Sequence, residues 1–544
     1  MPPIGYNIII KLSYGNTFSA VILYHIDKKI YPFIHSLAAK IYTFALHFLR
    51  KAHSNMFLKT KSMRKKAHRL TLLRAAALMI LVASTAAKTW AQNYFDENGG
   101  YFGPTEESPQ YGGAYYTGNY TSPFKTYLGK TDAEIQAKLD ELWNHYFKGG
   151  YNQVIYYESG RGEAYIKDTG NNDVRSEGIS YGMMICVQTN HKEEFDKLWN
   201  WAKAHMWTKY GEWDGYFAWQ NSTAGVMKDR NNCPDAEMYF MMSLLLAANR
   251  WHDARYMQYA QYILSRCWKN GSGSLFNEAY YIITFQPYNA STFSDPSYDL
   301  PAYVDLFSRW TDTNKDKWKN ATTATRTHLY KSSHPTSGLF SDYNNFDGTP
   351  HSESYNRNAV KYMYDAVRCA MNFGMDYYLF GVDAERQQVM AKRIIDFFEA
   401  DGYSHARFNW DGSGPSESYT LGQVGSNAVA CYALMSTPGY EDIIRKNLRM
   451  AWDARLMTGQ YRYYDGMVHY LSMLHLCGAF KIWKPEKEIP TRYQSQYHSI
   501  ITGIKSPATF SDSRAWYTLD GVRLKVKPTA KGAYINNGRK VVIN

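Results

Sequence analysis

A series of helix-forming segments of moderate length constrains the fold of this 544-residue chain more than any other feature. Apolar residues recur at helical spacing, and Thr131 to Glu134 forms a capping box before the first of these segments. The segments show no heptads and no repeat consensus, and few alternate apolar and polar residues with period two before the C-terminus. The pattern predicts an all-α fold in which helical hairpins pack around a common centre. We expect about twelve helices, near residues 131–143, 177–188, 195–202, 237–249, 254–267, 299–310, 315–331, 358–379, 385–400, 423–436, 441–454 and 465–482.

Met63 begins a segment with the three parts of a secretory signal peptide. A basic stretch comes first, an apolar run covers 75–83, and small residues continue to Ala91. The apolar run is too short to span a bilayer, and no cysteine follows it that could carry a lipid anchor. We therefore expect residues 63–91 to be a signal peptide and residues 1–62 to lie upstream of the true start. The mature protein should be periplasmic or extracellular, without a membrane span.

The formal charge of +12 does not indicate a nucleic-acid partner, because the excess lies in the N-terminal segment. Up to Gln92 there are fourteen Lys and Arg against one acid, Asp27. The rest of the chain has about 47 basic and 48 acidic residues and is nearly neutral. This asymmetry is typical of a targeting segment, so we expect no nucleic-acid partner.

The segments that flank the helical region, 126–485, lack its periodicity. Residues 92–125 are rich in Gly, Tyr, Pro and Thr without a period, which predicts an irregular lead-in. A polar, Pro-containing linker is expected over 486–505. Residues 506–544 contain strand-like runs with Asp-Gly and Asn-Gly turn signals, which predict a small β-rich appendage.

Six cysteines lie far apart, mostly inside apolar helical patterns. They form no CxxC motif, and no His pair has the spacing of a zinc site. We interpret them as buried free thiols and expect neither a metal site nor a cofactor. The cysteines are Cys186, Cys233, Cys267, Cys369, Cys431 and Cys477.

The stretch Asp168–Met184, DTGNNDVRSEGISYGMM, begins with turn formers and then becomes helical. Ser176 is placed to cap the helix, so Glu177 should stand in its first turn. A carboxylic acid enclosed by aromatic residues suits a general acid, because burial raises its pKa. The chain is rich in such residues, with 15 Trp and 48 Tyr. The alternative interpretation is that Glu177 only complements the helix dipole.

Seven further motifs follow this stretch in sequence. They are GYFAWQ (215–220), PDAEMYF (234–240), DPSYDLPAYVDLF (295–307), HPTSGL (334–339), FDGTP (346–350), YDAVRCAMNFGMD (364–376) and RYYDGMVHYLSMLHL (462–476). The ordered set resembles glycoside hydrolase family 8, and above all its oligoxylanase branch. The likeness covers roughly residues 125 to 485.

The resemblance implies an (α/α)6 barrel over residues 126–485 and inverting hydrolysis of β-1,4-linked sugars. The proton donor of the family corresponds to Glu177, and its catalytic base corresponds to Asp365. A further family Asp, here Asp235, contacts the sugar at the cleavage point and helps to hold the distorted ring. Inversion needs one protonated and one ionised carboxyl about 6.5–9.5 Å apart, so that a water fits between them.

Arg368 follows Asp365 by one helical turn, and we expect it to keep that carboxylate ionised and to contribute to substrate binding. An ordinary i, i+3 surface ion pair is the alternative interpretation.

Aromatic residues in the motifs match family positions along the substrate cleft. Trp219 should stack on a sugar ring, and Tyr298 should lie close to the base and its water. Tyr464, with its neighbour Tyr463, matches later aromatics of the cleft. Three residues should brace the loop of the acid: Asp168, Asp173 and Arg175.

The sequence departs from the family pattern at two places. Ala236 replaces the usual Gly of the PDxE motif, which bears on the backbone of Asp235. The exo-acting enzymes of this branch carry a Leu-His-Pro loop that closes the cleft, and the aligned segment here is Ser418-Tyr419-Thr420. Either Tyr419 closes the cleft instead, or the cleft is open and the enzyme is endo-acting.

The leading hypothesis is an exported, monomeric inverting glycosidase that releases xylose from the reducing end of xylan-derived oligosaccharides. An endo-β-1,4-xylanase or an endo-β-1,4-glucanase of the same family is the first alternative. A non-catalytic glycan-binding protein belongs to a different class, and the presence of all three carboxylates argues against it. A polysaccharide lyase would need a Tyr or His base and a group that neutralises a uronate, and no such set stands out.

Overall fold

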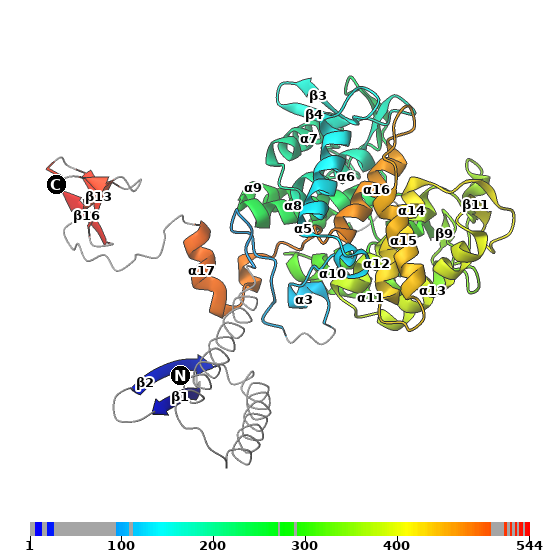
Figure 1. The fold of residues 1–544 in the computed structure, drawn as a ribbon. Coiled ribbons are helices and arrows are strands. Elements are labelled where there is room, and N and C mark those ends of the chain that lie inside the picture. Colours follow the sequence, from blue (N-terminus) through cyan, green and yellow to red (C-terminus); the bar gives the residue numbers. More distant parts are fainter. Residues whose placement is uncertain are drawn as a thin grey trace, which may run out of the picture. The chain divides into compact units, whose positions relative to one another are not determined.

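The computed structural model describes residues 6–13, 19–26, 94–107, 112–269, 273–287, 291–501 and short segments between 516 and 543 (Figure 1). The chain divides into two compact units, residues 1–92 and 93–544. In the first unit, β1 (Tyr6–Ser13) and β2 (Ser19–Ile26) pair as an antiparallel hairpin. The predicted signal peptide, 63–91, lies outside the described residues.

Between residues 132 and 476, the described chain forms twelve helices that alternate between two concentric layers. The inner helices contact one another in order, and α16 also contacts α6, so the ring closes. Each outer helix packs on a neighbour of the inner ring. This arrangement is an (α/α)6 barrel, which confirms the predicted fold class. The inner helices are α6 (Ser176–Gln188), α8 (Pro234–Trp251), α10 (Pro301–Trp310), α12 (Arg368–Leu379), α14 (Leu421–Ala430) and α16 (Tyr464–Leu476). The outer helices are α5 (Asp132–Trp143), α7 (Lys192–His205), α9 (Ala254–Arg266), α11 (Lys315–Ser332), α13 (Ala384–Asp401) and α15 (Glu441–Asp453).

Composition explains which helices form the inner layer. Every residue of α8 except the last, Trp251, is buried, so this helix needs apolar or satisfied residues on all sides. The outer helix α9 buries Tyr256, Ala260, Ile263 and Leu264, which form a single stripe at spacings of four, three and one. Helices of the first kind fill the centre, and helices of the second kind cover it.

Short strands occur in the connections that lead from an outer helix to the next inner helix. The elaborated loops therefore gather at the N-terminal ends of the inner helices. The antiparallel sets are β3 (Tyr156–Gly160) with β4 (Glu163–Ile166); β5 (Asp173–Arg175), β6 (Gln220–Ser222) and β7 (Met227–Asp229); β8 (Phe293–Ser294) with β9 (Asn344–Asn345); and β10 (Lys361–Tyr362), β11 (His405–Asn409) and β12 (Ser416–Ser418).

Two helix boundaries differ from the prediction. The helix expected over 358–379 begins only at Arg368, because the preceding residues form short 3-10 turns and the strand β10, which pairs with β11. Those turns are η4 (Arg357–Val360) and η5 (Asp365–Val367). The helix expected to reach residue 482 ends at Leu476, since Gly478 adopts a left-handed conformation with φ +67°.

The ends of the second unit contain more regular structure than the sequence predicted. The lead-in holds two short helices, α3 (Ala114–Thr117) and α4 (Pro123–Leu128). The expected linker 486–505 contains η7 (Glu486–Glu488) and the helix α17 (Thr491–Ile501). The strands of the tail form the expected β-rich appendage: β13 (Trp516–Thr518), β14 (Arg523–Leu524), β15 (Gly532–Asn536) and β16 (Arg539–Ile543). In the described part of the chain, no helix has the length and apolar character needed to cross a membrane.

Candidate active site

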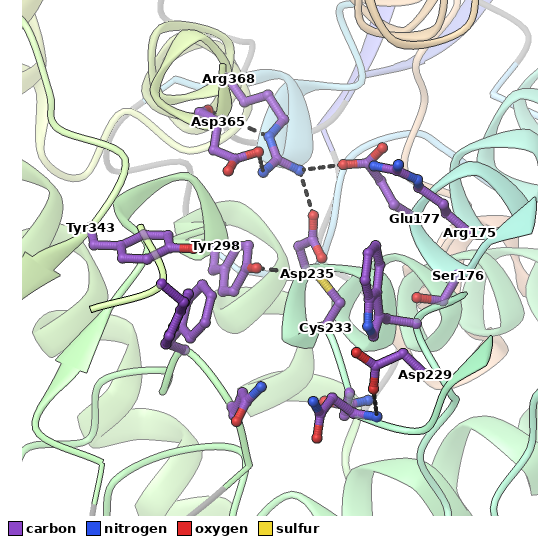
Figure 2. Close-up of a pocket in the computed structure, with 16 residues that line it drawn as sticks. Arg175, Ser176, Glu177, Asp229, Cys233, Asp235, Tyr298, Tyr343, Asp365 and Arg368 are labelled. Carbon is purple, nitrogen blue, oxygen red and sulfur yellow. Dashed lines mark hydrogen bonds and ion pairs between the residues drawn. The ribbon is translucent and has the colours of Figure 1, made fainter. Parts of the chain in front are cut away.

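A cavity of about 560 Å³ opens where the N-terminal ends of α6, α8 and α12 meet. Figure 2 shows its side chains, with Glu177, Asp235 and Asp365 gathered around the guanidinium of Arg368. The lining residues come from the first turns of inner helices and from the loops that precede them. They are Arg175, Ser176, Glu177, Trp219, Asp229, Asn231, Asn232, Cys233, Asp235, Phe285, Gln286, Tyr298, Tyr343, Tyr355, Asp365 and Arg368.

Glu177 stands in the first turn of α6, as predicted, but Ser176 does not cap that helix. Arg175 occupies the N-cap position, and Ser176 is the first helical residue, with its N–H donating to the carbonyl of Trp219 at 3.0 Å. Glu177 Oε1 accepts a hydrogen bond from the hydroxyl of Tyr463 at 2.9 Å. Burial raises the pKa of Glu177 to about 7, although the nearby Arg368 acts in the opposite direction.

The loop before α6 is braced by its own carboxylates. Asp168 Oδ1 accepts the backbone N–H groups of Gly170 and Asn171 at 2.9 and 3.1 Å. Arg175 pairs with Asp168 at 3.0 Å and with Asp173 at 3.4 Å. Its guanidinium also lies 5.3 Å from the ring centroid of Trp219, which ties this loop to the cavity wall.

Arg368, the first residue of α12, is the centre of the charged cluster. Its Nη1 donates to Glu177 Oε2 at 3.1 Å and to Asp235 Oδ2, and its Nη2 donates to Asp365 Oδ1 at 3.0 Å. The side chain is almost fully buried, and Tyr181 accepts a further hydrogen bond from Nη1 at 2.7 Å. Arg368 is therefore the common partner of the three carboxylates. It also lines the cavity, and its contribution to substrate binding stays a prediction.

Asp365 belongs to the turn η5 and keeps about a third of its side chain (35 %) exposed. Arg368 lowers its pKa, as expected, but burial outweighs this effect and leaves the pKa of Asp365 above its ordinary value. Arg368 therefore acts on Asp365 in the expected direction, but burial opposes it.

Glu177 and Asp365 lie on opposite sides of the guanidinium, held by different nitrogens (Figure 2). The guanidinium of Arg368 bonds Glu177 Oε2 at 3.1 Å and Asp365 Oδ1 at 3.0 Å. The distance between these two oxygens therefore cannot exceed the two bond lengths plus the spacing of the two guanidinium nitrogens. That separation stays below the upper limit of about 9.5 Å for inverting glycosidases. Both carboxyls line the same cavity, so a water in the cavity can reach both.

Asp235 lies in the first turn of α8, directly after Pro234, and is almost fully buried. Its Oδ1 accepts the N–H of Ala236 at 2.8 Å, and its Oδ2 is bound by Arg368. Ala236 is itself fully buried, so the replacement of the usual Gly is accommodated in the core.

The predicted aromatics divide into two groups. Trp219 and Tyr298 line the cavity, and the hydroxyl of Tyr298 shares a hydrogen bond with Cys233 Sγ at 3.2 Å. All six cysteines are free; five are buried, whereas Cys233 is partly exposed in the cavity wall. Tyr464 donates to the carbonyl of Tyr364 at 2.8 Å and so holds a loop, while its neighbour Tyr463 contacts Glu177.

Sequence reasoning missed several lining residues and, among the buried carboxylates, Asp295. Phe285, Tyr343 and Tyr355 lie in loops without periodicity, where the abundance of Tyr and Phe conceals which rings face the cavity. Asp295 opens the DPSY motif, which drew attention only to Tyr298. Asp295 Oδ2 lies 3.9 Å from Arg368 Nη2, and burial raises the pKa of Asp295 well above its usual range.

Tyr419, the candidate for closing the cleft, is half-buried and packs against the core. Its ring packs against Phe398 and Tyr403 at centroid distances of 5.4 and 5.6 Å. Its hydroxyl accepts a hydrogen bond from Asn427 Nδ2 at 2.7 Å. Tyr419 is not among the residues that line the cavity of the three carboxylates.

Comparison with known proteins agrees with the geometry. The family model for glycosyl hydrolases family 8 matches residues 153–476. A reducing end xylose-releasing exo-oligoxylanase of Halalkalibacterium halodurans is 36% identical over 69% of this chain and 97% of its own. The crystal structure of Rex8A from Paenibacillus barcinonensis complexed with xylose has a TM-score of 0.64 and 35% identity, and covers 69% of this chain and 100% of that one. A xylohexaose complex of a catalytic mutant of the family 8 xylanase from Teredinibacter turnerae also has a TM-score of 0.64 at 35% identity, over 68% of this chain and 99% of that one.

The family match covers more than half of the chain, and it contains the barrel helices α6 to α16 and each of the three carboxylates on Arg368. This chain is an inverting glycoside hydrolase that belongs to glycosyl hydrolase family 8.

Proposed function

We propose that this enzyme cleaves β-1,4-xylosidic bonds and releases xylose from the reducing end of xylo-oligosaccharides. The observation that carries the proposal is the gathering of Glu177, Asp235 and Asp365 on one guanidinium in a cavity of about 560 Å³. The similarity to a reducing end xylose-releasing exo-oligoxylanase over 97% of its length supports this choice of substrate.

In the proposed reaction, Glu177 is the general acid. A pKa of about 7 leaves a substantial fraction of the carboxyl protonated near neutral pH, and this proton passes to the oxygen of the leaving sugar. An ordinary glutamate would already have lost its proton under these conditions.

Asp365 is the proposed general base. Its partial exposure lets it bind a water in the cavity, and Arg368 favours its ionised form. The water attacks the anomeric carbon on the face opposite to the leaving group, while Asp365 takes its proton, so the configuration inverts.

Asp235 and the aromatic rings are proposed to hold the substrate. Asp235 stabilises the strained, positively charged sugar at the cleavage point, Trp219 stacks on a sugar face, and Tyr298 lies beside the water. We propose that Arg368 acts by positioning the three carboxyls, because its side chain is only 3% exposed.

Product analysis tests the proposal directly. Xylotriose and its borohydride-reduced form would be digested in parallel with xylan and carboxymethylcellulose, and the products separated by chromatography. Release of xylose only from the unreduced trisaccharide is the expected result. Proton NMR of the first anomer should show the α-product of inversion; an initial β-product would contradict the roles given to Glu177 and Asp365.

An endo-β-1,4-xylanase is the second candidate, and the position of Tyr419 favours it. The ring packs against Phe398 and Tyr403 and is not part of the cavity lining, which supports a cleft that is open at the segment aligned with the Leu-His-Pro loop. Release of long fragments from xylan, together with cleavage of reduced xylotriose, would identify the enzyme as an endo-xylanase.

We further propose that the enzyme is exported, acts as a monomer and binds no nucleic acid. The charge asymmetry of the first 92 residues supports export. N-terminal sequencing of the secreted protein should give a mature end after residue 91, and a mature end upstream of Met63 would remove the proposal of a signal peptide. Size-exclusion chromatography with light scattering tests the oligomeric state.

A further inference from the structure

Asp342 lies between the motifs HPTSGL and FDGTP and is almost fully buried beneath the loop that carries Asp365. Its carboxylate accepts three backbone N–H groups of that loop. Oδ1 accepts from Met363 at 3.3 Å and from Ala366 at 3.1 Å, and Oδ2 accepts from Tyr364 at 3.4 Å. These amides belong to residues on both sides of Asp365, so one carboxylate holds the backbone before and after the base.

The carbonyl groups of the same loop are held from other elements. The carbonyl of Met363 accepts from Arg407 at 2.6 Å, that of Tyr364 accepts from Tyr464 at 2.8 Å, and that of Asp365 accepts from Arg368 at 3.4 Å. The N–H of Asp342 also donates to the carbonyl of Lys361 at 3.0 Å. The loop is therefore fixed along its length by groups from several parts of the barrel.

Burying a charged carboxylate at this position costs free energy, and hydrogen bonds to the carboxylate must offset that cost. Burial and the nearby Asp365 raise the pKa of Asp342 to about 7, which shows how closely two like charges are placed. The three N–H groups lie at the start of the helical segment η5 and α12, where backbone donors lack partners within the helix. Asp342 supplies those partners, which explains why an acid is present beside the base.

We propose that Asp342 is a positioning residue for the hydrolysis: it fixes residues 363–366 so that Asp365 stays against Arg368 Nη2 and faces the cavity. The inference rests on the proposed role of Asp365 as general base. Asp342 acts only through that residue and takes no part in substrate contact.

The substitution Asp342→Asn tests this role with little change in shape. The amide nitrogen would face the N–H of Tyr364, donor against donor, and the residue before the base would lose its partner. We expect kcat on xylotriose to fall about 10- to 100-fold, because a displacement of about 1 Å in a reacting group has an effect of this size. KM should change less than about two-fold. Asp347→Asn is the matched control, since Asp347 is exposed in the same connection and accepts from Thr349 at 2.9 Å, so its kcat should stay at the wild-type value.

A double-variant cycle separates positioning from general destabilisation. In an Asp365→Asn background the base is already absent, so adding Asp342→Asn should lower the residual kcat no further. An equal loss in both backgrounds would overturn the proposal, as would a single variant with full kcat. Asp342→Glu keeps both acceptor oxygens and should recover part of the activity lost in the Asn variant.

If Asp342→Asn does not fold, the same cycle with Asp342→Glu decides the question, with the same non-additivity expected. The failure of the inference is distinguishable from failure of the proposed function. A wild-type enzyme that cleaves xylan or glucan instead of xylotriose changes only the assay substrate, and the cycle is then run on that glycan. A wild-type enzyme that cleaves none of them would overturn the proposed function itself.

Discussion

At the scale of single residues, one guanidinium shared among several acids governs the chemistry of the site. Arg368 lies within ion-pairing distance of Glu177, Asp235, Asp295 and Asp365. One positive charge cannot balance four negative ones in a buried site, so protons are retained there. Burial, reinforced by this excess of acids, explains why Glu177 keeps a proton near neutral pH, while Asp365, which is more exposed, is the better candidate for the ionised partner.

Replacement of the proposed acid should abolish turnover without removing substrate binding. Glu177→Gln keeps the shape of the side chain but has no proton to give, so kcat should fall by about 10²- to 10⁴-fold. Isothermal titration calorimetry should still detect xylo-oligosaccharide binding. Glu212→Gln, at an exposed position, serves as the control. Near-normal turnover of the Glu177 variant would contradict the assignment.

The pH profile should follow the protonation of Glu177. The acid must be protonated, so activity should decline as pH rises through about 7, the pKa of that group. The hydroxyl of Tyr463 stabilises the ionised form by donating to it, and its removal in Tyr463→Phe should raise the pKa of Glu177. The alkaline limb of kcat/KM should therefore move to higher pH. In Tyr464→Phe, whose hydroxyl contacts a backbone carbonyl instead, the limb should stay in place whatever happens to kcat.

At the scale of secondary-structure elements, the N-terminal ends of the inner helices carry the chemistry. Glu177 and Asp235 both stand in first turns, those of α6 and α8, and Arg368 opens α12. A helix start places backbone donors and the positive end of the dipole near a carboxylate, which partly offsets the cost of burying it. The outer layer packs against these helices from outside and supplies none of the three.

The strand β12 and the helix α14 flank Tyr419, and its substitution should reveal a structural role. Tyr419→Ala removes a half-buried ring and its hydrogen bond with Asn427, so the melting temperature should fall, as expected for a loss of about 2 kcal/mol. The distribution of product lengths should not change, because the ring points away from the cavity. Tyr355→Ala gives the opposite pattern, since Tyr355 is 66% exposed and lines the cavity: products or KM should change while stability does not. Altered products in the Tyr419 variant would show that this segment shapes the cleft after all.

At the scale of the whole molecule, contacts between α16 and α6 close the ring of inner helices. The segment that follows the barrel packs against the lead-in, residues 92–125. Glu488 accepts hydrogen bonds from the hydroxyl of Tyr115 at 2.6 Å and from Trp310 Nε1 at 2.7 Å. Ile489 is buried against Phe95 and Tyr101. These contacts join residues nearly 400 positions apart, so the first part of the predicted linker belongs to the folded core.

Two truncations distinguish the core from the tail. A chain that ends at residue 505 keeps the contacts of Glu488 and should retain both activity and melting temperature. A chain that ends at residue 485 loses them, together with the burial of Ile489, and should be less stable by about 3 kcal/mol or more. Denaturant unfolding of the two chains measures the difference. Equal stability would show that the segment after 485 contributes nothing to the barrel.

Much of the fold was predictable because helical periodicity is a local property. The spacing of apolar residues located twelve helices, and the motifs between them indicated Glu177, Asp235 and Asp365. Boundaries were less accurate where a distant group competes for the backbone. Residues 361–362 pair with β11, and the amides just after them bond to Asp342, so the helix begins ten residues later than its pattern suggested.

The sequence by itself determined the helical architecture, the order of the motifs and the identity of the main acidic residues. Only the tertiary structure decided that Arg368 joins them, that Tyr463 rather than Tyr464 contacts Glu177, and that Tyr419 packs against Phe398. The reason is physical. Periodicity records which face of a helix avoids water, whereas the partners of a side chain depend on which helix ends the closing ring brings together.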